Sequence, residues 1–215
     1  VKVTDASARR VAVTLPPLSD TPVLLPDSIA PVLAVDVDRL AVATIDWRQG
    51  TRSGTLSGAT LAYTGDSRSH RLRDVRVKAQ GAALAADASV GARKPYPVDA
   101  RIALDLAAPH PAGRVHATGK GSLEALVVEA TSTLRGVDAR ARIDLAPLAA
   151  QSVVGGRIEA RALDLVALDR AWPTTRLDVA VDAKPVIGGY AGKVEVRNAI
   201  AGPVDSRRVP LARLA

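Results

Sequence analysis

The sequence predicts an all-β chain: an elongated, mostly antiparallel, curved sheet that forms an open groove, β-taco or solenoid-like, with little helix. Three observations lead to this prediction. Apolar and polar residues alternate with a period of two, glycine and proline interrupt the alternation at short intervals, and the apolar residues are nearly all small or aliphatic. This combination is typical of an antiparallel sheet that has water on one side.

Three segments show the alternation most clearly, at residues 98–106, 137–145 and 177–183. Successive side chains of a strand point to opposite faces of a sheet, so each segment has one apolar and one polar face. The first two segments, VDARIALDL and VDARARIDL, also resemble each other. A binary pattern that recurs from strand to strand indicates a repetitive, quasi-linear architecture.

Weaker alternation predicts further strands within residues 33–47, 75–79, 84–90, 158–162 and 194–197. In the first of these the apolar parity changes after Val37 and again after Val42, and such slips indicate bulges that bend a sheet. Turn signals separate the segments, and they lie at Gly50, Gly54, Gly58, residues 65–67, Gly81, residues 155–156 and residues 188–189.

Two regions depart from this pattern. Residues 1–32 are predicted to be an irregular or edge lead-in, because prolines are frequent between residues 16 and 31. Residues 33–215 are then one continuous, repetitive groove segment, with a sub-boundary near 109–113. The best candidate for a helix is residues 163–172, only two turns long, with Asp164 as N-cap and a loop as the alternative.

The composition restricts both the core and the partners. Among 215 residues there is no Phe, Met or Cys, and only two Trp and three Tyr. Aromatic side chains normally supply much of a core, so their scarcity favours a shallow sheet or a groove. The net charge of +7 comes from 29 basic and 22 acidic residues that are interleaved along the chain. Without a basic run or stacking aromatics, no nucleic-acid binding is expected.

The absence of Cys excludes a disulfide framework and a Cys-based zinc site. No apolar stretch approaches the ~18–20 residues that a membrane-spanning helix needs. The first residues resemble no signal peptide and include no initiator Met. The chain is therefore expected to be a fragment of a longer protein whose targeting signal lies elsewhere.

Motifs for chemistry are incomplete. Residues 113–121 resemble a phosphate-binding loop, but five residues instead of four separate the glycines, and Gly121 follows Lys120 where Ser or Thr is required. Acid pairs such as Asp178 and Asp182 lie on a wet sheet face, where they are expected to aid solubility and to protect edges.

The histidines His70, His110 and His116 are expected to be solvated loop residues, because a metal site would need further ligands and a second shell. No catalytic residue, metal or cofactor is predicted, and the chain is not expected to be an enzyme.

The candidate functional surface is the apolar face of the predicted strands, where small Ala positions among branched aliphatics leave room for an apolar cargo. Its predicted lining is Val35, Val37, Val75, Val77, Val98, Ala100, Ile102, Leu104, Val137, Ala141, Ile143, Ile158, Leu177, Val179, Val181, Val194 and Val196.

Short passages along most of the chain carry a family resemblance. They are LPPL at 15–18, LAVDVDRL at 33–40, LAY at 61–63, HRL at 70–72, YPVDAR at 96–101, GSLEAL at 121–126, LDL at 163–165, WP at 172–173 and GPVDSRRVPL at 202–211. In this order they resemble an internal segment of the TamB family, the AsmA-like or DUF490-type proteins of Gram-negative envelopes.

The resemblance implies a specific role. TamB-like proteins are inner-membrane-anchored subunits of the translocation and assembly module, and they cross the periplasm as a long β-groove. Together with a TamA-like Omp85 partner, which binds another region, they are implicated in the assembly of autotransporters and other outer-membrane proteins. Related proteins are implicated in phospholipid transport. The expected cargo is therefore phospholipid acyl chains or nascent outer-membrane β-barrel proteins.

A structural alternative remains at this point. The same alternation is compatible with a closed β-sandwich or solenoid that seals its aliphatic face as a core and acts only as a spacer. A sealed core must reach native packing density, which a chain without large apolar residues does poorly.

Overall fold

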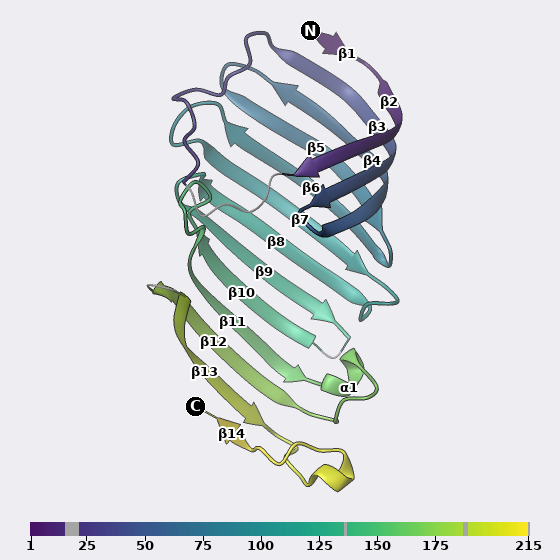
Figure 1. The fold of residues 1–215 in the computed structure, drawn as a ribbon, viewed down its shortest axis with the longest axis vertical. Helices are drawn as coiled ribbons and strands as arrows, with labels where there is room; N and C mark the ends of the chain where they lie inside the picture. Colours follow the sequence, from purple (N-terminus) through teal and green to yellow (C-terminus); the bar gives the residue numbers. More distant parts are fainter. Residues whose placement is uncertain (16–21, 136, 187–188, 215) are drawn as a thin grey trace.

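The computed structural model describes residues 1–15, 22–135, 137–186 and 189–214, which form one sheet of 14 strands (Figure 1). The strands are β1 (Lys2–Val3), β2 (Ala6–Leu15), β3 (Val35–Gln49), β4 (Arg52–Gly65), β5 (Ser69–Ala79), β6 (Ala82–Gly91), β7 (Pro97–Leu106), β8 (Gly113–Ser122), β9 (Leu126–Leu134), β10 (Val137–Leu145), β11 (Val153–Leu163), β12 (Leu177–Val186), β13 (Gly189–Asn198) and β14 (Arg213–Leu214). The helical elements are α1 (Leu165–Leu168) and the 3-10 turn η1 (Val204–Ser206).

The strands follow one another along the sheet. From β3 to β14 each strand pairs antiparallel with the next in the sequence, so the long axis of the molecule is the stacking direction (Figure 1). At the other edge, β1 and β2 both pair parallel with β3. Neither end of the sheet pairs with the other, which confirms the predicted open, curved, all-β architecture. The closed β-sandwich is therefore not the form that this chain adopts.

Residues 1–32 were predicted to be an irregular or edge lead-in. They contain two strands, β1 and β2, which form the edge of the sheet. The parallel pairing of these strands was not predicted. The predicted sub-boundary near 109–113 falls on the turn between β7 and β8 and on the first residue of β8, and these two strands pair over their whole lengths. The predicted two-turn helix is a single turn, α1, and the Asp164 side chain does not cap it.

Some glycines that suggested turns lie inside strands. Gly54 is in β4, where a Cβ atom would come within 2.7 Å of the Trp47 indole nitrogen. Gly156 is in β11, paired with Ile143 of β10. At Gly54 the close approach of the Trp47 ring explains the glycine, whereas a Cβ atom on Gly156 would meet its neighbours at 3.4 Å or more, which is ordinary contact. Of the residues 188–189, the first lies outside the described part of the chain.

The parity changes expected in residues 33–47 arise from irregular pairing. The register of β3 with β4 shifts between Val37 and Leu40, as predicted. Further along, the pairing passes over Ala43, and nearby Gly58 of β4 has a φ of 59°. Such irregularities increase the local twist and bend the strands. The N-terminal strands accordingly curl toward the viewer in Figure 1 and make one face of the sheet concave.

Two further bulges share one construction. Asp74 in β5 and Ala162 in β11 have φ values of 52° and 50°, and the pairing with the following strand shifts at both places. The amide of each bulged residue donates to an aspartate of the next strand: Asp74 to Asp87 at 3.0 Å, and Ala162 to Asp178 at 3.1 Å. Asp178 thus satisfies a backbone donor that the ladder leaves free, in addition to lying on the polar face as expected.

Replacing Asp178 by alanine is expected to lower the free energy of unfolding by about 1 kcal/mol, because the bulge amide loses its acceptor. Replacement by asparagine keeps an acceptor oxygen and is expected to cost less. Urea unfolding measures the difference, and hydrogen exchange of the Ala162 amide localises it. Equal losses for the two variants would mean that the charge of Asp178, and not its bond to the bulge, matters.

A strap formed by residues 22–34 runs along one rim of the sheet, across the turns that join the strands. Its backbone bonds to three points of this rim: Val23 N donates to Leu148 O, Ile29 N to Ala92 O, and Asp27 O accepts from Lys94 N. Tyr96, the largest fully buried side chain of the described residues, donates its hydroxyl to Pro26 O. The small core of the molecule therefore includes this rim as well as the sheet.

Candidate functional site: a charge-free inner face

The pairing register places the predicted lining residues on one face of the sheet, called the inner face below. Directly paired residues of neighbouring strands have their side chains on the same face. One such row runs through Val75, Ala86, Ile102, Ala117, Ala130, Ala141, Ile158, Val181 and Val194, with one position in each strand from β5 to β13. A parallel row runs through Val77, Leu84, Leu104, Val115, Ser132, Ala139, Ala160, Val179 and Val196.

The inner face carries no charge over most of its length. From β6 to β12 the inward positions of the described residues contain only Gly, Ala, Val, Leu and Ile, apart from Ser132 and Pro185. None of the 29 basic and 22 acidic residues of the chain therefore lies at a described inward position of β6 to β12. Such a surface has no charged group to bind an ion, but it can bind an alkyl chain through the hydrophobic effect.

The inner face is open to solvent along its middle. Ile102 and Ile158 of the first row are 41% and 46% exposed, although β7 and β11 lie inside the sheet, and Val194 of β13, near the C-terminal edge, is 45% exposed. Side chains in a sealed core would be almost fully buried. With about 4.8 Å between neighbouring strands, the row from β5 to β13 is roughly 38 Å long. The groove is therefore a continuous, solvent-exposed apolar surface.

The bottom of the groove is lined by small residues at its centre. In β8 the inward positions are Gly113, Val115, Ala117, Gly119 and Gly121. Ala130 and Ala141 continue the small positions into β9 and β10. A Cβ atom on Gly119 would meet Leu126, Ala100 and Val128 at 3.7–3.9 Å, which is ordinary contact. The centre of the face is thus wide enough to accept side chains or cargo above it.

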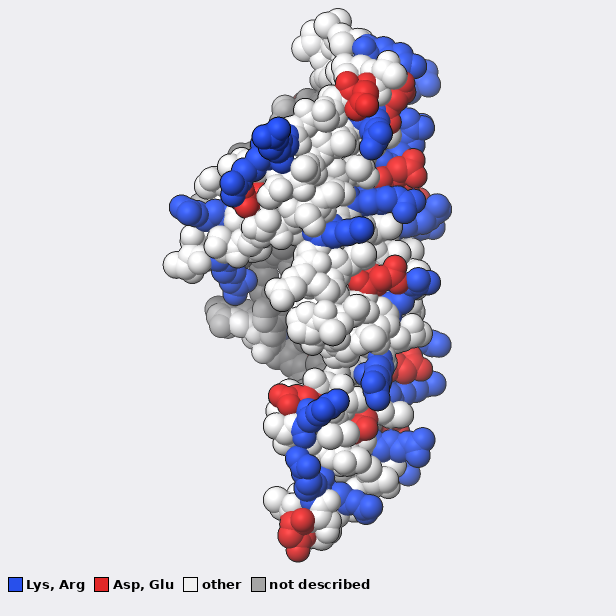
Figure 2. All heavy atoms as spheres, turned by 90° about the vertical axis from the view of Figure 1, so that its right-hand side faces the viewer, with Lys and Arg blue, Asp and Glu red and all other residues white. Residues whose placement is uncertain are grey.

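The opposite, outer face carries the charged residues. Figure 2 shows Lys, Arg, Asp and Glu side chains gathered over the length of the side that is turned away from the viewer in Figure 1. Neighbouring strands supply pairs such as Arg142–Glu129 at 2.9 Å and Arg114–Asp105 at 2.5 Å. These pairs are exposed and contribute little stability each. Their main effect is to keep one side of the sheet hydrated.

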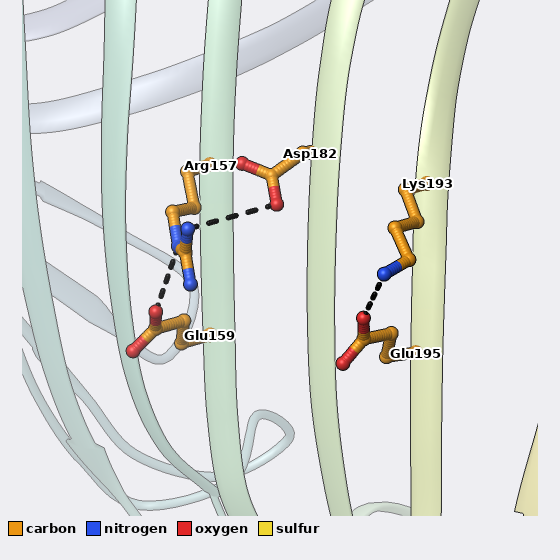
Figure 3. A network of polar contacts seen from close by, with 5 residues as sticks. All are labelled: Arg157, Glu159, Asp182, Lys193 and Glu195. Carbon is orange, nitrogen blue, oxygen red and sulfur yellow. Dashed lines mark hydrogen bonds and ion pairs between the residues drawn. The ribbon is translucent and has the colours of Figure 1, made fainter. Parts of the chain in front are cut away.

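One network of such contacts lies on β11, β12 and β13 (Figure 3). Arg157 contacts Glu159 of its own strand at 2.8 Å and Asp182 of the next strand at 3.8 Å. The hydrogen bond to Glu159 raises the pKa of the Arg157 guanidinium. In β13, the hydrogen bond from Lys193 lowers the pKa of the Glu195 carboxyl. Both carboxylates are therefore oriented along their own strands (Figure 3).

The three histidines are not all loop residues. His116 is in β8, on the outer face, and His110 is an exposed turn residue. His70 is in β5, half-buried, where Nδ1 lies 2.8 Å from the Tyr63 hydroxyl and Nε2 lies 2.9 Å from Ile29 O. The expectation of a solvated loop is wrong for His70, because the strap covers this part of the rim. The described residues contain no group of His, Cys, Asp and Glu suited to a metal ion.

The sequence missed part of the inner face. Leu72, Leu84, Val115, Val128 and Leu145 also lie on it, in rows with the predicted residues. The alternation around Val115 could have identified β8, but the glycines there suggested a loop. In β9 the sequence LVVEATSTL alternates only in its second half.

Comparison with known proteins identifies no relative. No family model matches the chain, and no curated protein and no solved structure matches it. Within the described residues, no helix is long and apolar enough to cross a membrane.

Proposed function

We propose that the inner face shields the acyl chains of phospholipids while these move along the sheet, as part of a larger envelope-biogenesis protein of the TamB type. The observation that carries the proposal is the charge-free inner face with its exposed middle row, Ile102, Ile158 and Val194. Such surface is costly to expose to water in a protein without an apolar ligand or partner.

The energetics suit transport. An acyl chain in water costs about 0.8 kcal/mol for each exposed methylene, or on the order of 12 kcal/mol for ~15 methylenes. Contact with a continuous aliphatic surface removes much of this cost. Because every position along the row is similar, affinity changes little from strand to strand, and the chain can slide. A row of roughly 38 Å exceeds the ~30 Å thickness of a bilayer core, which holds two chains end to end.

The surrounding assembly is proposed on the family resemblance. The full-length protein would be anchored in the inner membrane by a segment other than residues 1–215, would place this groove in the periplasm, and would meet a TamA-like partner through another region. No residue of this chain is assigned to that contact, and no chemical step, cofactor or nucleic acid takes part in the proposed function.

A second candidate function uses the edges of the sheet. The outer edge of β2 pairs with no strand among the described residues, and β14 covers β13 only at Val196 and Arg197. Free strand edges can accept an incoming strand by β-augmentation. Nascent β-barrel proteins would be cargo of this kind. Because the inner face is far more extensive than either edge, acyl chains are the primary proposal.

The proposal predicts that filling the centre of the groove blocks binding. The triple variant A117W/A130W/A141W places bulky side chains at adjacent inward positions of β8, β9 and β10. Its affinity for a fluorescent fatty acid is expected to fall on the order of tenfold, because the space above the small residues is occupied.

The matched control is H116W/T131W/R140W, at adjacent outward positions of the same strands. It is expected to leave the affinity unchanged. If both triple variants bind the fatty acid as the wild type does, or if both lose it equally, the inner face is not the binding surface.

A further inference from the structure

A hollow on the outer face lies over β11 to β14, at the C-terminal end of the sheet. It has a volume of about 750 Å³, and its charged lining residues are Glu159, Arg161, Asp178, Glu195, Arg197 and Arg213. The uncharged lining residues are Ala160, Val179, Ala180, Val196, Ala212 and Leu214 of the same strands and the residue before β14. The site is separate from the apolar groove, which lies on the other side of the sheet.

Each carboxylate of this hollow is already engaged. Glu159 pairs with Arg157 at 2.8 Å, and Glu195 pairs with Lys193 (Figure 3). Asp178 accepts the bulge amide of Ala162 at 3.1 Å. The acids are therefore directed toward neighbours along their own strands or toward the backbone.

The three guanidinium groups have no such partners. Among the described residues, the guanidinium groups of Arg161, Arg197 and Arg213 form no hydrogen bond or close ion pair, and Arg213 attracts Glu195 only at longer range. Arg197 is directly opposite Arg213 of β14 on one side and Asp178 of β12 on the other, and the Asp178 carboxylate already accepts the Ala162 amide. Like charges in directly opposed positions destabilise a strand pair. An anion bound between the two would turn this repulsion into attraction.

We propose that the hollow binds a phosphate group through Arg197 and Arg213, with Arg161 as the third donor. A guanidinium group presents its N–H donors as a planar fork that matches two oxygens of a phosphate, and several forks can share one tetrahedral anion. Strands β11, β13 and β14 supply one donor each, so binding would also hold the short β14 strand on the edge of the sheet. The phosphate belongs to a lipid headgroup or to a free phosphate ion.

The test uses the full chain with inorganic phosphate at constant ionic strength, and isothermal titration calorimetry measures the affinity. R161Q/R197Q/R213Q is expected to weaken phosphate binding on the order of tenfold or more. The control R76Q/R101Q/R140Q removes the same charge from outer-face positions of β5, β7 and β10, and it is expected to bind as the wild type does.

Thermal unfolding gives a second readout. Phosphate is expected to raise the Tm of the wild type and of the control but not of R161Q/R197Q/R213Q, because only a ligand of the folded state stabilises it. No phosphate binding by the wild type, or equal loss in both triple variants, would overturn the proposal.

Vesicle sedimentation distinguishes the two sources of phosphate. Binding to phosphatidylglycerol vesicles that is lost in R161Q/R197Q/R213Q and displaced by inorganic phosphate identifies a lipid headgroup as the ligand. Binding of inorganic phosphate without binding of vesicles identifies a soluble phosphate. A wild type that binds neither probe has no phosphate site in this hollow.

Discussion

Replacing Ile102 and Ile158 together by glutamate is expected to abolish the binding of a fluorescent fatty acid to the chain. Both residues lie in the same row of the inner face, on β7 and β11, and each is more than 40% exposed. A bound alkyl chain would have to strip water from the new carboxylates, and burying an unpaired charge costs several kcal/mol. The expected loss of affinity is on the order of a hundredfold or more.

The fold is expected to tolerate this change. Because the two isoleucines are partly in water, the glutamates can remain hydrated in the unliganded protein, and the free energy of unfolding should fall by only about 1–2 kcal/mol. The control is A103E/A180E, which adds the same charges to outward positions of β7 and β12. Unchanged fatty-acid binding by I102E/I158E, in a protein that remains folded, would exclude the groove as the binding surface.

Replacing Tyr96 by alanine is expected to give the largest loss of stability of any single substitution in the described residues. The side chain is 0% exposed, lies between the strap and the rim, and donates its hydroxyl to Pro26 O. Removing a fully buried aromatic ring costs about 3–5 kcal/mol. Urea unfolding measures this loss, and hydrogen exchange of the Ile29 and Lys94 amides reports whether the strap detaches.

Tyr96→Phe separates the ring from the hydroxyl. It keeps the packing and removes one buried hydrogen bond, so the expected loss is about 1 kcal/mol and the strap should remain in place. If Tyr96→Ala is no less stable than Tyr96→Phe, the strap and the rim do not depend on this ring. In that case the buried position of Tyr96 has little energetic meaning.

The alternation in the sequence predicted the sheet and the identity of its two faces. Strands such as β7, β10 and β12 follow a strict period of two, and a shift of one residue would move every aliphatic side chain into the charged face. Their register was therefore determined locally. The open form was favoured over a closed sandwich, which stayed an alternative, because a chain with no Phe or Met has few side chains that could close a core.

Other features depended on contacts between distant residues. The parallel pairing of β2 with β3, the strap and the two half-buried ring nitrogens of His70 arise from tertiary contacts that leave no periodic signal. In β8 the inward positions are mostly glycine and alanine, so the period was hidden by residues that also favour turns. Asp87 and Asp178, which accept the bulge amides, were predicted only to lie on the polar face. Their hydrogen bonds depend on the cross-strand register at the bulge, which the sequence pattern does not contain.

The central claim is that the inner face is open and contacts lipid, and photo-crosslinking in cells tests it most directly. A photoreactive residue is placed at Ile102 or Ile143 on the inner face of the full-length protein, with Arg101 or Arg142 of the outer face as controls. Mass spectrometry then identifies the adducts. Phospholipid adducts at the two isoleucine positions, and not at the arginine positions, are the predicted result. Adducts with nascent β-barrel proteins would favour the second candidate function, and no adduct at either isoleucine position would contradict the proposed transport role.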